Sequence, residues 1–408
     1  MSEQKLSIET RGGVVEGSCD PKFKGVLDAF VANFDARDEL GASVAITLDG
    51  KAVVDLWGGR KTPGGDPWTK DTISMVWSNT KGASAIAAHL AAERGLLDLD
   101  APVASYWPEF ATNGKEDAVV AMMLDHSVGV PAIREPMKPG ACCDFDYMTD
   151  RIARERPFWQ PGTRHGYHGF TYAWTVGGLM RRATGRPLGE FFRTEVAAPL
   201  GADFWIGLPE TEEHRVAPMI MPADALFGGR SPANVAMEKD PSAPVTLMMT
   251  NDGGFDANSR ACRAAEICSA NGMSNGRGLA RLYAPLANGA LLSRETIARM
   301  GRVSTASHID ATLLMPTRFG LGFMKTVDNR RNGSLVDCTL LMSEEAFGHV
   351  GFGGSLGFAD PAARMSFGYT MNRMGVGVMI GERGQSLVDA AYRSIGYGSN
   401  ASGAWVPA

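Results

Sequence analysis

The sequence predicts an α+β fold, with an antiparallel β-sheet built from both chain ends and flanked by helices, and with a mainly helical lobe between those ends. Three observations lead to this prediction: strand-like runs near the N-terminus, helical patterns in the middle, and a return of strand-like runs near the C-terminus. We expect a sheet domain from residues 1–80 and 310–408 and a helical domain from residues 81–309. The crevice between two such lobes is the natural place for a ligand site.

The N-terminal strands are predicted as a hairpin that follows a helix. Residues 42–48 (ASVAITL) and 51–57 (KAVVDLW) are typical of strands, and Asp49-Gly50 between them supplies the positive φ angles of a tight turn. Residues 23–40 carry apolar side chains at helical spacing, which predicts a helix packed on one face of the sheet.

The rest of the chain divides into a helical middle and a strand-rich end. Helical patterns cover residues 83–94, 176–184, 188–198, 261–269 and 274–287. Strand-like runs then cover residues 319–326, 349–359 and 364–372, with Asp360-Pro361 at a bend, and residues 383–396 predict a closing helix.

The composition indicates a folded protein with a large core. The chain of 408 residues is 44% hydrophobic and 21% charged, which excludes the disordered, collagen-like and coiled-coil classes. Its net charge of -5 is mild, and no basic block is long enough to follow a phosphate backbone. We therefore expect no nucleic-acid partner.

The sequence also lacks the usual signals for a membrane or a metal. No segment approaches the roughly 20 apolar residues that span a bilayer, and residues 1–20 contain no apolar run typical of a secretory signal. We expect a soluble, cytoplasmic protein without a membrane partner, whose six cysteines are reduced. No CxxC or HExxH motif is present, and His165 with His168 is a weak metal signal, so we expect neither a metal nor a cofactor.

One candidate nucleophile is Ser355, in the sequence Gly353-Gly354-Ser355-Leu356-Gly357. The pattern matches the GxSxG turn of α/β-hydrolases, but in that fold the catalytic histidine follows the serine and a helix follows the turn. Here all seven histidines precede Ser355, and the residues after it predict strands. We interpret Ser355 as part of a glycine-rich strand that allows another backbone or a ligand to approach closely.

A second candidate is Ser78, in the SxxK sequence of residues 78–81. The match alone carries little weight, because residues 2–5 form another, but Ser78 follows an extended apolar run and begins a predicted buried helix. Ser78 and Lys81 share one helix face. Burial and the helix dipole disfavour a charged lysine, which could then act as the base that a serine hydroxyl needs. The alternative is that Ser78 only caps the helix and Lys81 lies at the surface.

Further segments favour the same chemistry. Tyr167 lies on a glycine-flanked turn, where a phenol close to a lysine could relay a proton to a leaving group. Residues 349–353 open a strand with little side-chain bulk, whose edge could face a substrate carbonyl. Asp125 and His126 lie in a turn, and we interpret both as structural residues below the site.

The sequence resembles the serine β-lactamase-like superfamily through several motifs in a fixed order. They are Ser78-x-x-Lys81, residues 95–103 (GLLDLDAPV), His126-Ser-x-Gly129, Tyr167-His168-Gly169 and His349-x-Gly351. This superfamily, with the fold of class C β-lactamases and DD-peptidases, also contains the family VIII carboxylesterases, to which the resemblance is closest. The resemblance runs from about Phe23 to the C-terminus.

The resemblance implies a role for each matching residue. Ser78 would be the nucleophile, Lys81 its proton acceptor, and Tyr167 the group that passes protons to the leaving group and to the deacylating water. The backbone amides of Ser78 and Phe352 would form the oxyanion hole, where one donor is typically worth about 3 kcal/mol. Candidate substrate-pocket residues are His349, Gly351, His168 and Gly353. Independently of the resemblance, the methionines at 122, 123, 248, 249, 371 and 374 could form an adaptable wall, although we expect most of them to pack in the core.

Two departures from the class C pattern indicate the substrate. The asparagine expected two residues after the tyrosine is Gly169 here, and the strand's Lys-Thr-Gly is His349-Val350-Gly351. The strand therefore lacks a fixed positive charge for a substrate carboxylate. We predict a serine carboxylesterase that hydrolyses uncharged, small-molecule, short-chain esters through an acyl-enzyme.

Several alternatives remain open from the sequence. The same residues could serve a β-lactamase, a D-peptidase, another amide hydrolase or an acyltransferase. A non-catalytic scaffold is the alternative from a different class, although such a protein has no need of Ser78, Lys81 and Tyr167 together. The oligomeric state is also open.

Overall fold

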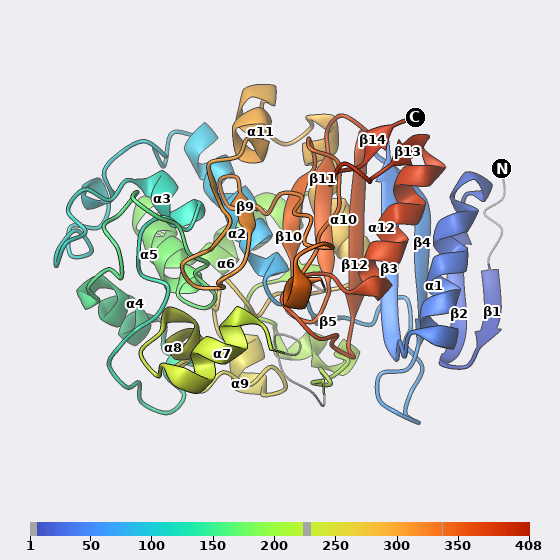
Figure 1. The fold of residues 1–408 in the computed structure, drawn as a ribbon, viewed down its shortest axis with the longest axis horizontal. Coiled ribbons are helices and arrows are strands. Elements are labelled where there is room, and N and C mark those ends of the chain that lie inside the picture. The colour runs from blue at the N-terminus through green and yellow to red at the C-terminus, as the bar shows by residue number, and fades with distance from the viewer. Residues whose placement is uncertain (1–5, 223–229, 337) are drawn as a thin grey trace.

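A seven-stranded antiparallel sheet forms the centre of the computed structural model, which describes residues 6–222, 230–336 and 338–408 (Figure 1). Its strand order is β1-β2-β4-β3-β12-β11-β10. The strands are β1 (Leu6–Thr10), β2 (Gly13–Cys19), β3 (Gly41–Leu48), β4 (Lys51–Gly59), β10 (Phe347–Val350), β11 (Leu356–Asp360) and β12 (Met365–Met371). Both chain ends therefore build one sheet, which confirms the predicted α+β fold.

The chain ends meet where β3 pairs with β12, and both strands are buried almost throughout. Helices cover both faces of the sheet (Figure 1). On one face lie α1 (Lys24–Ala36) and α12 (Glu382–Ser394), where Phe358 stacks on both Phe367 and Tyr392. Successive residues of a strand point to opposite faces, so Ser366 reaches the other side and donates to the Ala280 carbonyl of α10 (Gly276–Asn288).

A glycine allows α10 to approach the sheet closely. A Cβ atom on Gly368 would lie 2.3 Å from the carbonyl oxygen of Gly276, at the start of the helix. The helix therefore lies against the sheet even though its residues fall inside the predicted helical domain. The boundaries of the two domains stay a prediction.

The other helices gather beside the sheet, on the left of Figure 1. They are α2 (Asn79–Glu93), α3 (Val120–Leu124), α4 (Phe145–Arg154), α5 (Tyr172–Thr184), α6 (Leu188–Phe192), α7 (Pro232–Lys239), α8 (Pro244–Thr250), α9 (Arg260–Ala264) and α11 (Arg294–Gly301). Helix α2 is buried from Asn79 to Ala91 and contacts both α5 and β10. It therefore joins the helical region to the edge of the sheet.

Short elements complete the described structure. A small sheet pairs β5 (Ser74–Met75), β7 (Met273–Ser274) and β6 (Phe204–Trp205), and two hairpins pair β8 (Thr305–Ser307) with β9 (Thr317–Phe319) and β13 (Tyr397–Ser399) with β14 (Val406–Pro407). The 3-10 turns are Pro21–Phe23, Val103–Ser105, Ala141–Cys143, Glu210–Arg215 and Gly333–Leu335, and Arg193–Ala197 is a π-type turn after α6. No helix in the described ranges combines the length and the apolar character needed to cross a bilayer.

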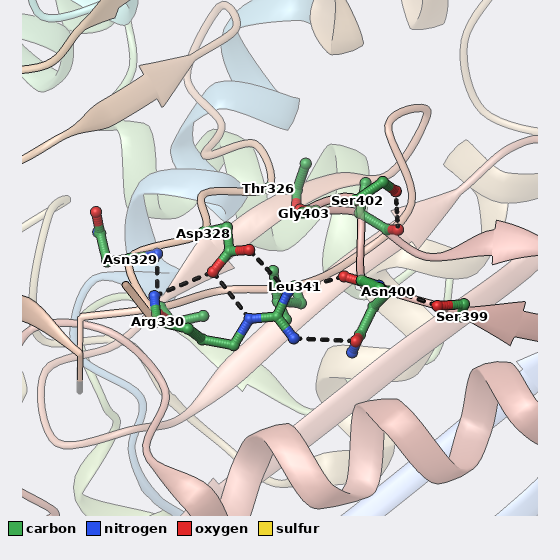
Figure 2. A network of polar contacts seen from close by, with 12 residues as sticks. Thr326, Asp328, Asn329, Arg330, Leu341, Ser399, Asn400, Ser402 and Gly403 are labelled. Carbon is green, nitrogen blue, oxygen red and sulfur yellow. Dashed lines mark hydrogen bonds and ion pairs between the residues drawn. The ribbon is translucent and has the colours of Figure 1, made fainter. Parts of the chain in front are cut away.

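Polar contacts tie the C-terminal segment to the body of the protein (Figure 2). The guanidinium of Arg330 donates to the carboxylate of Asp328 and to both the side-chain and the backbone oxygen of Asn400. The hydroxyl of Thr326 donates to the Gly403 carbonyl. This network fixes the segment that ends in β14 and does not include the predicted site residues.

The predicted hairpin is confirmed, with Asp49 and Gly50 at φ 51° and 76°. Three predicted elements differ from the structure. The single strand at 349–359 is wrong, because Gly353 and Gly354 adopt φ of 83° and 114° and turn the chain between β10 and β11. The other two are the strand at 319–326, where β9 ends at Phe319, and the helix at 261–269, which ends at Ala264 because the Asn271 amide donates to the carbonyls of Cys262 and Ala265.

The first two strands were not predicted from the sequence. Strand β1 is at best half-buried, and β2 has only two buried residues. Strands at or next to a sheet edge that bury so few side chains give little hydrophobic alternation, which is the signal that predicts a strand.

Candidate active site

Ser78 lies at a sharp turn between β5 and α2. The residue before it, Trp77, has a φ of 48°, a left-handed conformation that a bulky residue adopts only under strain, at a cost of about 1–3 kcal/mol. Ser78 occupies the N-cap position of α2, yet its side chain makes no capping hydrogen bond. Its side chain lines a cavity instead. The geometry therefore does not support the alternative that Ser78 serves only as a helix cap.

Lys81 lies one turn further along α2 and is fully buried. Its Nζ atom is 3.1 Å from Ser78 Oγ and donates to the carbonyls of Gly169, at 2.7 Å, and Ser269, at 3.0 Å. Burial lowers the pKa of Lys81 well below its usual value. A neutral amine has two N–H groups and one lone pair, so the two carbonyls take the hydrogens and the lone pair is left for the Ser78 hydroxyl.

Tyr167 completes the group around the Ser78 hydroxyl. Its ring centroid is 4.8 Å from Lys81 Nζ, and its side chain lines the same cavity. Burial raises the pKa of Tyr167 above its usual value, and a hydrogen bond with Ser78 opposes this rise. The structure thus brings Ser78, Lys81 and Tyr167 together from segments about ninety residues apart.

A buried carboxylate holds the loop that carries Tyr167. Asp310 accepts the Tyr167 amide at 3.0 and 3.1 Å, the Thr312 and Leu313 amides at 2.8 Å each, and the Thr317 hydroxyl at 3.0 Å. The role of Asp310 was not predicted from the sequence. It lies 143 residues from Tyr167, and no local pattern links the two.

Histidines support the same loop as neutral groups. His168 Nε2 accepts the Val130 amide at 3.0 Å, so Nδ1 carries the hydrogen and donates to the Gly166 carbonyl at 2.7 Å. His126 Nδ1 accepts the amide of His168 at 3.2 Å. Burial lowers the pKa of His168 to about 3 and that of His126 well below its usual value. Both side chains therefore fix the loop around Tyr167.

The cavity at Ser78 has a volume of about 180 Å³ and mostly apolar walls. Its lining residues are Trp77, Ser78, Tyr167, Gly169, Phe170, Met221, Met248, Met249, Asp252, Phe255, Ala270, Leu313, Met324, Val350, Phe352 and Val378. Phe352 and two of the predicted methionines are in this wall, whereas the methionines at 122, 123, 371 and 374 are not. Asp252 is the one charged side chain among these described residues.

The four predicted pocket residues, His349, Gly351, His168 and Gly353, are not in the cavity wall. All four are buried. A Cβ atom on Gly351 would lie 2.1 Å from Ser355 Oγ and 2.3 Å from the Val76 carbonyl oxygen, so this glycine lets the strand end pack against the segment before Ser78. The expectation that these four residues line the pocket is therefore corrected. Residues next to them in the sequence, such as Gly169 and Phe352, form the cavity wall instead.

The two amides predicted for the oxyanion hole belong to the two segments that meet where Gly351 packs against the Val76 carbonyl. Ser78 follows Val76 and Trp77, and Phe352 follows Gly351. Among the described residues, neither amide donates to a protein acceptor. Both are therefore free to donate to a ligand in the cavity that their side chains line.

Ser355 stands apart from this cavity. It is fully buried, its hydroxyl donates to the Val76 carbonyl at 3.0 Å, and it accepts the Asn79 amide at 3.0 Å. These bonds join β11 to the start of α2. The GxSxG pattern at this position therefore serves packing.

The protein-family model described as Beta-lactamase matches residues 27–397 of the sequence. The chain belongs to the beta-lactamase family. It is a serine hydrolase with the beta-lactamase fold, as the superfamily resemblance predicted.

Related proteins and structures cover nearly the whole chain. The esterase/beta-lactamase LipL of Mycobacterium tuberculosis (strain ATCC 25618 / H37Rv) is 34% identical over 383 residues, which cover 89% of this chain and 84% of LipL. The crystal structure of a family VIII carboxylesterase is 38% identical, with a TM-score of 0.82 and coverage of 93% of this chain and 99% of that one. A penicillin-binding protein homologue from Caulobacter crescentus is 32% identical, with a TM-score of 0.83 and the same coverage.

Proposed function

We propose that the enzyme is a serine carboxylesterase that hydrolyses short-chain esters through an acyl-enzyme on Ser78. The observation that carries this proposal is the 3.1 Å contact between Lys81 Nζ and Ser78 Oγ in a site where Lys81 is fully buried. Burial without an acidic partner lowers the pKa of Lys81 and favours its neutral form, which can remove the hydroxyl proton.

Acylation begins when the Ser78 proton moves to Lys81 and the serine oxygen attacks the ester carbonyl carbon. The negative charge that develops on the carbonyl oxygen is stabilised by the amides of Ser78 and Phe352. The ammonium formed on Lys81 keeps the Gly169 and Ser269 carbonyls as acceptors. These two carbonyls therefore stabilise the charge that the proton transfer creates.

Tyr167 returns the proton to the leaving alcohol. Its hydroxyl contacts Ser78, and its ring lies 4.8 Å from Lys81 Nζ, so it can donate a proton to the alkoxide and recover one from the ammonium. In deacylation, a water molecule attacks the carbonyl carbon of the acyl-enzyme, and the Ser78 oxygen is the leaving group. Its proton passes to Lys81 or Tyr167, and the acid leaves as Ser78 regains its hydrogen.

The cavity supports a small, uncharged substrate. Its volume of about 180 Å³ is close to that of an engineered cavity of about 150 Å³ that holds a benzene ring, and its walls are mostly apolar. The described lining contains no lysine, arginine or histidine, and its single charged group is the Asp252 carboxylate. An anionic substrate would meet a like charge there. The family VIII carboxylesterase and the esterase/beta-lactamase LipL among the relatives support ester hydrolysis.

Rates on matched chromogenic substrates test the proposal. We expect p-nitrophenyl acetate and butyrate to be hydrolysed faster than p-nitrophenyl octanoate. The acetate and the butyrate should also be hydrolysed faster than a chromogenic cephalosporin. The variant Ser78→Ala should lose this activity. Cephalosporin turnover above ester turnover would instead assign the enzyme to the amide branch of the family, and ester turnover that survives in Ser78→Ala would refute the nucleophile.

A further inference from the structure

Three cysteine side chains meet next to the segment that carries Asp252 and Phe255 of the cavity wall. Cys142 and Cys143 lie on the 3-10 turn Ala141–Cys143, and Cys262 lies in α9. Their sulfur atoms form a triangle with sides of 3.8 Å (Cys142 to Cys143), 3.8 Å (Cys142 to Cys262) and 3.6 Å (Cys143 to Cys262). All three are free thiols. We call these residues the cysteine triad.

The triangle has the size of a thiolate metal site. A tetrahedral Zn²⁺ ion with Zn–S bonds of about 2.3 Å separates its sulfur ligands by about 3.8 Å. The three sulfur ligand atoms lie within 4.8 Å of one another, and no fourth histidine, cysteine or carboxylate in the described part of the chain joins them. One coordination position would therefore be left for water or a small ligand.

The surrounding backbone fixes the triad in place. The amide of Cys142 donates to the Gly253 carbonyl at 3.2 Å, and the amide of Cys262 donates to the N-cap hydroxyl of Ser259 at 3.1 Å. The amide of Asp256 donates to Cys262 Sγ at 3.3 Å. Amide hydrogen bonds to sulfur are outer contacts that orient and stabilise metal-binding thiolates.

We propose that Cys142, Cys143 and Cys262 bind one thiolate-preferring metal ion, for which Zn²⁺ is the probe. Cys142 and Cys262 are buried and Cys143 is half-buried, so the ion enters past Cys143. Each thiol that binds as a thiolate releases one proton, and no group is oxidised or reduced. Soft sulfur ligands select Zn²⁺ or Cu(I) over Mg²⁺ and Ca²⁺.

The bound ion would stabilise the wall of the substrate cavity. Asp252 and Phe255 line that cavity, and the segment between and after them supplies the Gly253 carbonyl and the Asp256 amide that hold the triad. Metal binding joins the turn at 141–143 to α9 across this segment. The site is therefore a structural one beside the catalytic group, and its occupancy does not depend on which substrate the enzyme uses.

Metal titration of the full chain tests the proposal. The reduced, chelator-treated protein is titrated with Zn²⁺ in competition with a chromophoric chelator, and with Co²⁺ to record thiolate-to-cobalt charge-transfer absorption. We expect one Zn²⁺ per chain, that absorption band, and a higher melting temperature with Zn²⁺. Cys262→Ser should weaken binding by more than the roughly 10- to 100-fold that loss of an outer contact causes.

Two further variants complete the test. Cys143→Ser changes a half-buried thiol, so it provides a second ligand deletion if Cys262→Ser does not fold, as judged by circular dichroism. Cys19→Ser, at a half-buried cysteine on β2, is the matched control and should bind Zn²⁺ like the wild type. The proposal is overturned if the reduced wild type binds no stoichiometric Zn²⁺, or if both ligand variants bind it unchanged.

Discussion

Replacing Lys81 by methionine removes the proposed base and keeps an unbranched apolar side chain of similar length. Lys81 Nζ lies 3.1 Å from Ser78 Oγ, and in the described structure it is the sole side-chain nitrogen with a hydrogen-bond contact to that oxygen. General-base catalysis typically contributes about 10²- to 10⁴-fold. We therefore expect kcat for p-nitrophenyl acetate to fall by this factor, which corresponds to about 3–5 kcal/mol in the activation barrier.

The substitution also affects stability, and a second buried lysine provides the control. In Lys81→Met the carbonyls of Gly169 and Ser269 lose a donor, which costs about 1–3 kcal/mol each, while the cost of burying the amine disappears. Lys115 is likewise fully buried and donates to three backbone carbonyls, but it is not in the cavity wall. Lys115→Met should lower the melting temperature and leave kcat per folded molecule unchanged.

The pH profile separates a lost base from a damaged fold. Because burial lowers the pKa of Lys81 well below 10.5, wild-type kcat/KM should rise with pH and level off well below that value. The rise should be absent from the residual activity of Lys81→Met. A Lys81→Met enzyme that keeps kcat within about tenfold of the wild type, with the same pH profile, would refute the assigned base.

Four further predictions follow from other contacts in and around the site. Ser355→Ala should keep initial ester rates within about tenfold, because Ser355 is a packing residue, and inactivity of a folded variant would contradict this. Gly351→Ala should lower kcat at least about tenfold. The new Cβ would lie 2.3 Å from the Val76 carbonyl oxygen, so the strand end must shift and displace the Phe352 amide. An unchanged kcat would show that this strand end can shift without affecting catalysis. Asp252→Asn should raise kcat/KM for an ester with a free carboxylate about several-fold relative to a neutral ester, and an equal effect on both would exclude a role in charge selection. His168 and His349 are buried and neutral in the folded protein, each with a pKa of about 3. Below pH 6.5 these histidines bind protons in the unfolded chain and remain neutral in the folded protein. The free energy of unfolding should therefore fall by up to about 1.4 kcal/mol per pH unit for each histidine as the pH is lowered. Urea unfolding from pH 7 to 5 measures that slope, and an unchanged slope in His349→Gln would contradict the assignment.

Local signals predicted the parts of the fold that local physics decides. The hairpin formed because Asp49-Gly50 can adopt positive φ at both positions. The helix after Ser78 was predicted from apolar residues at helical spacing, and its burial, which includes Lys81, comes from the packing of other segments around it. The order of the motifs along the chain is enough to indicate the family.

Contacts between distant segments could not be predicted in this way. The carboxylate that holds Tyr167 comes from Asp310, 143 residues away, and the wall with Asp252 comes from a loop with no catalytic motif. The glycine-rich segment predicted the close approach of a ligand or another backbone, and at residues 351 and 353 the close neighbours are protein atoms. A glycine-rich strand indicates that another group approaches the backbone closely. Whether that group is a ligand or another part of the protein depends on the tertiary packing.

The most direct measurement is the site of covalent labelling by an organophosphonate. The intact protein is inhibited, digested and mapped by mass spectrometry, with Ser78→Ala as the control. We predict one phosphonyl group per chain, on Ser78, and no labelling of the control. Labelling on Ser355 or any other side chain, with Ser78 unmodified, would contradict the account.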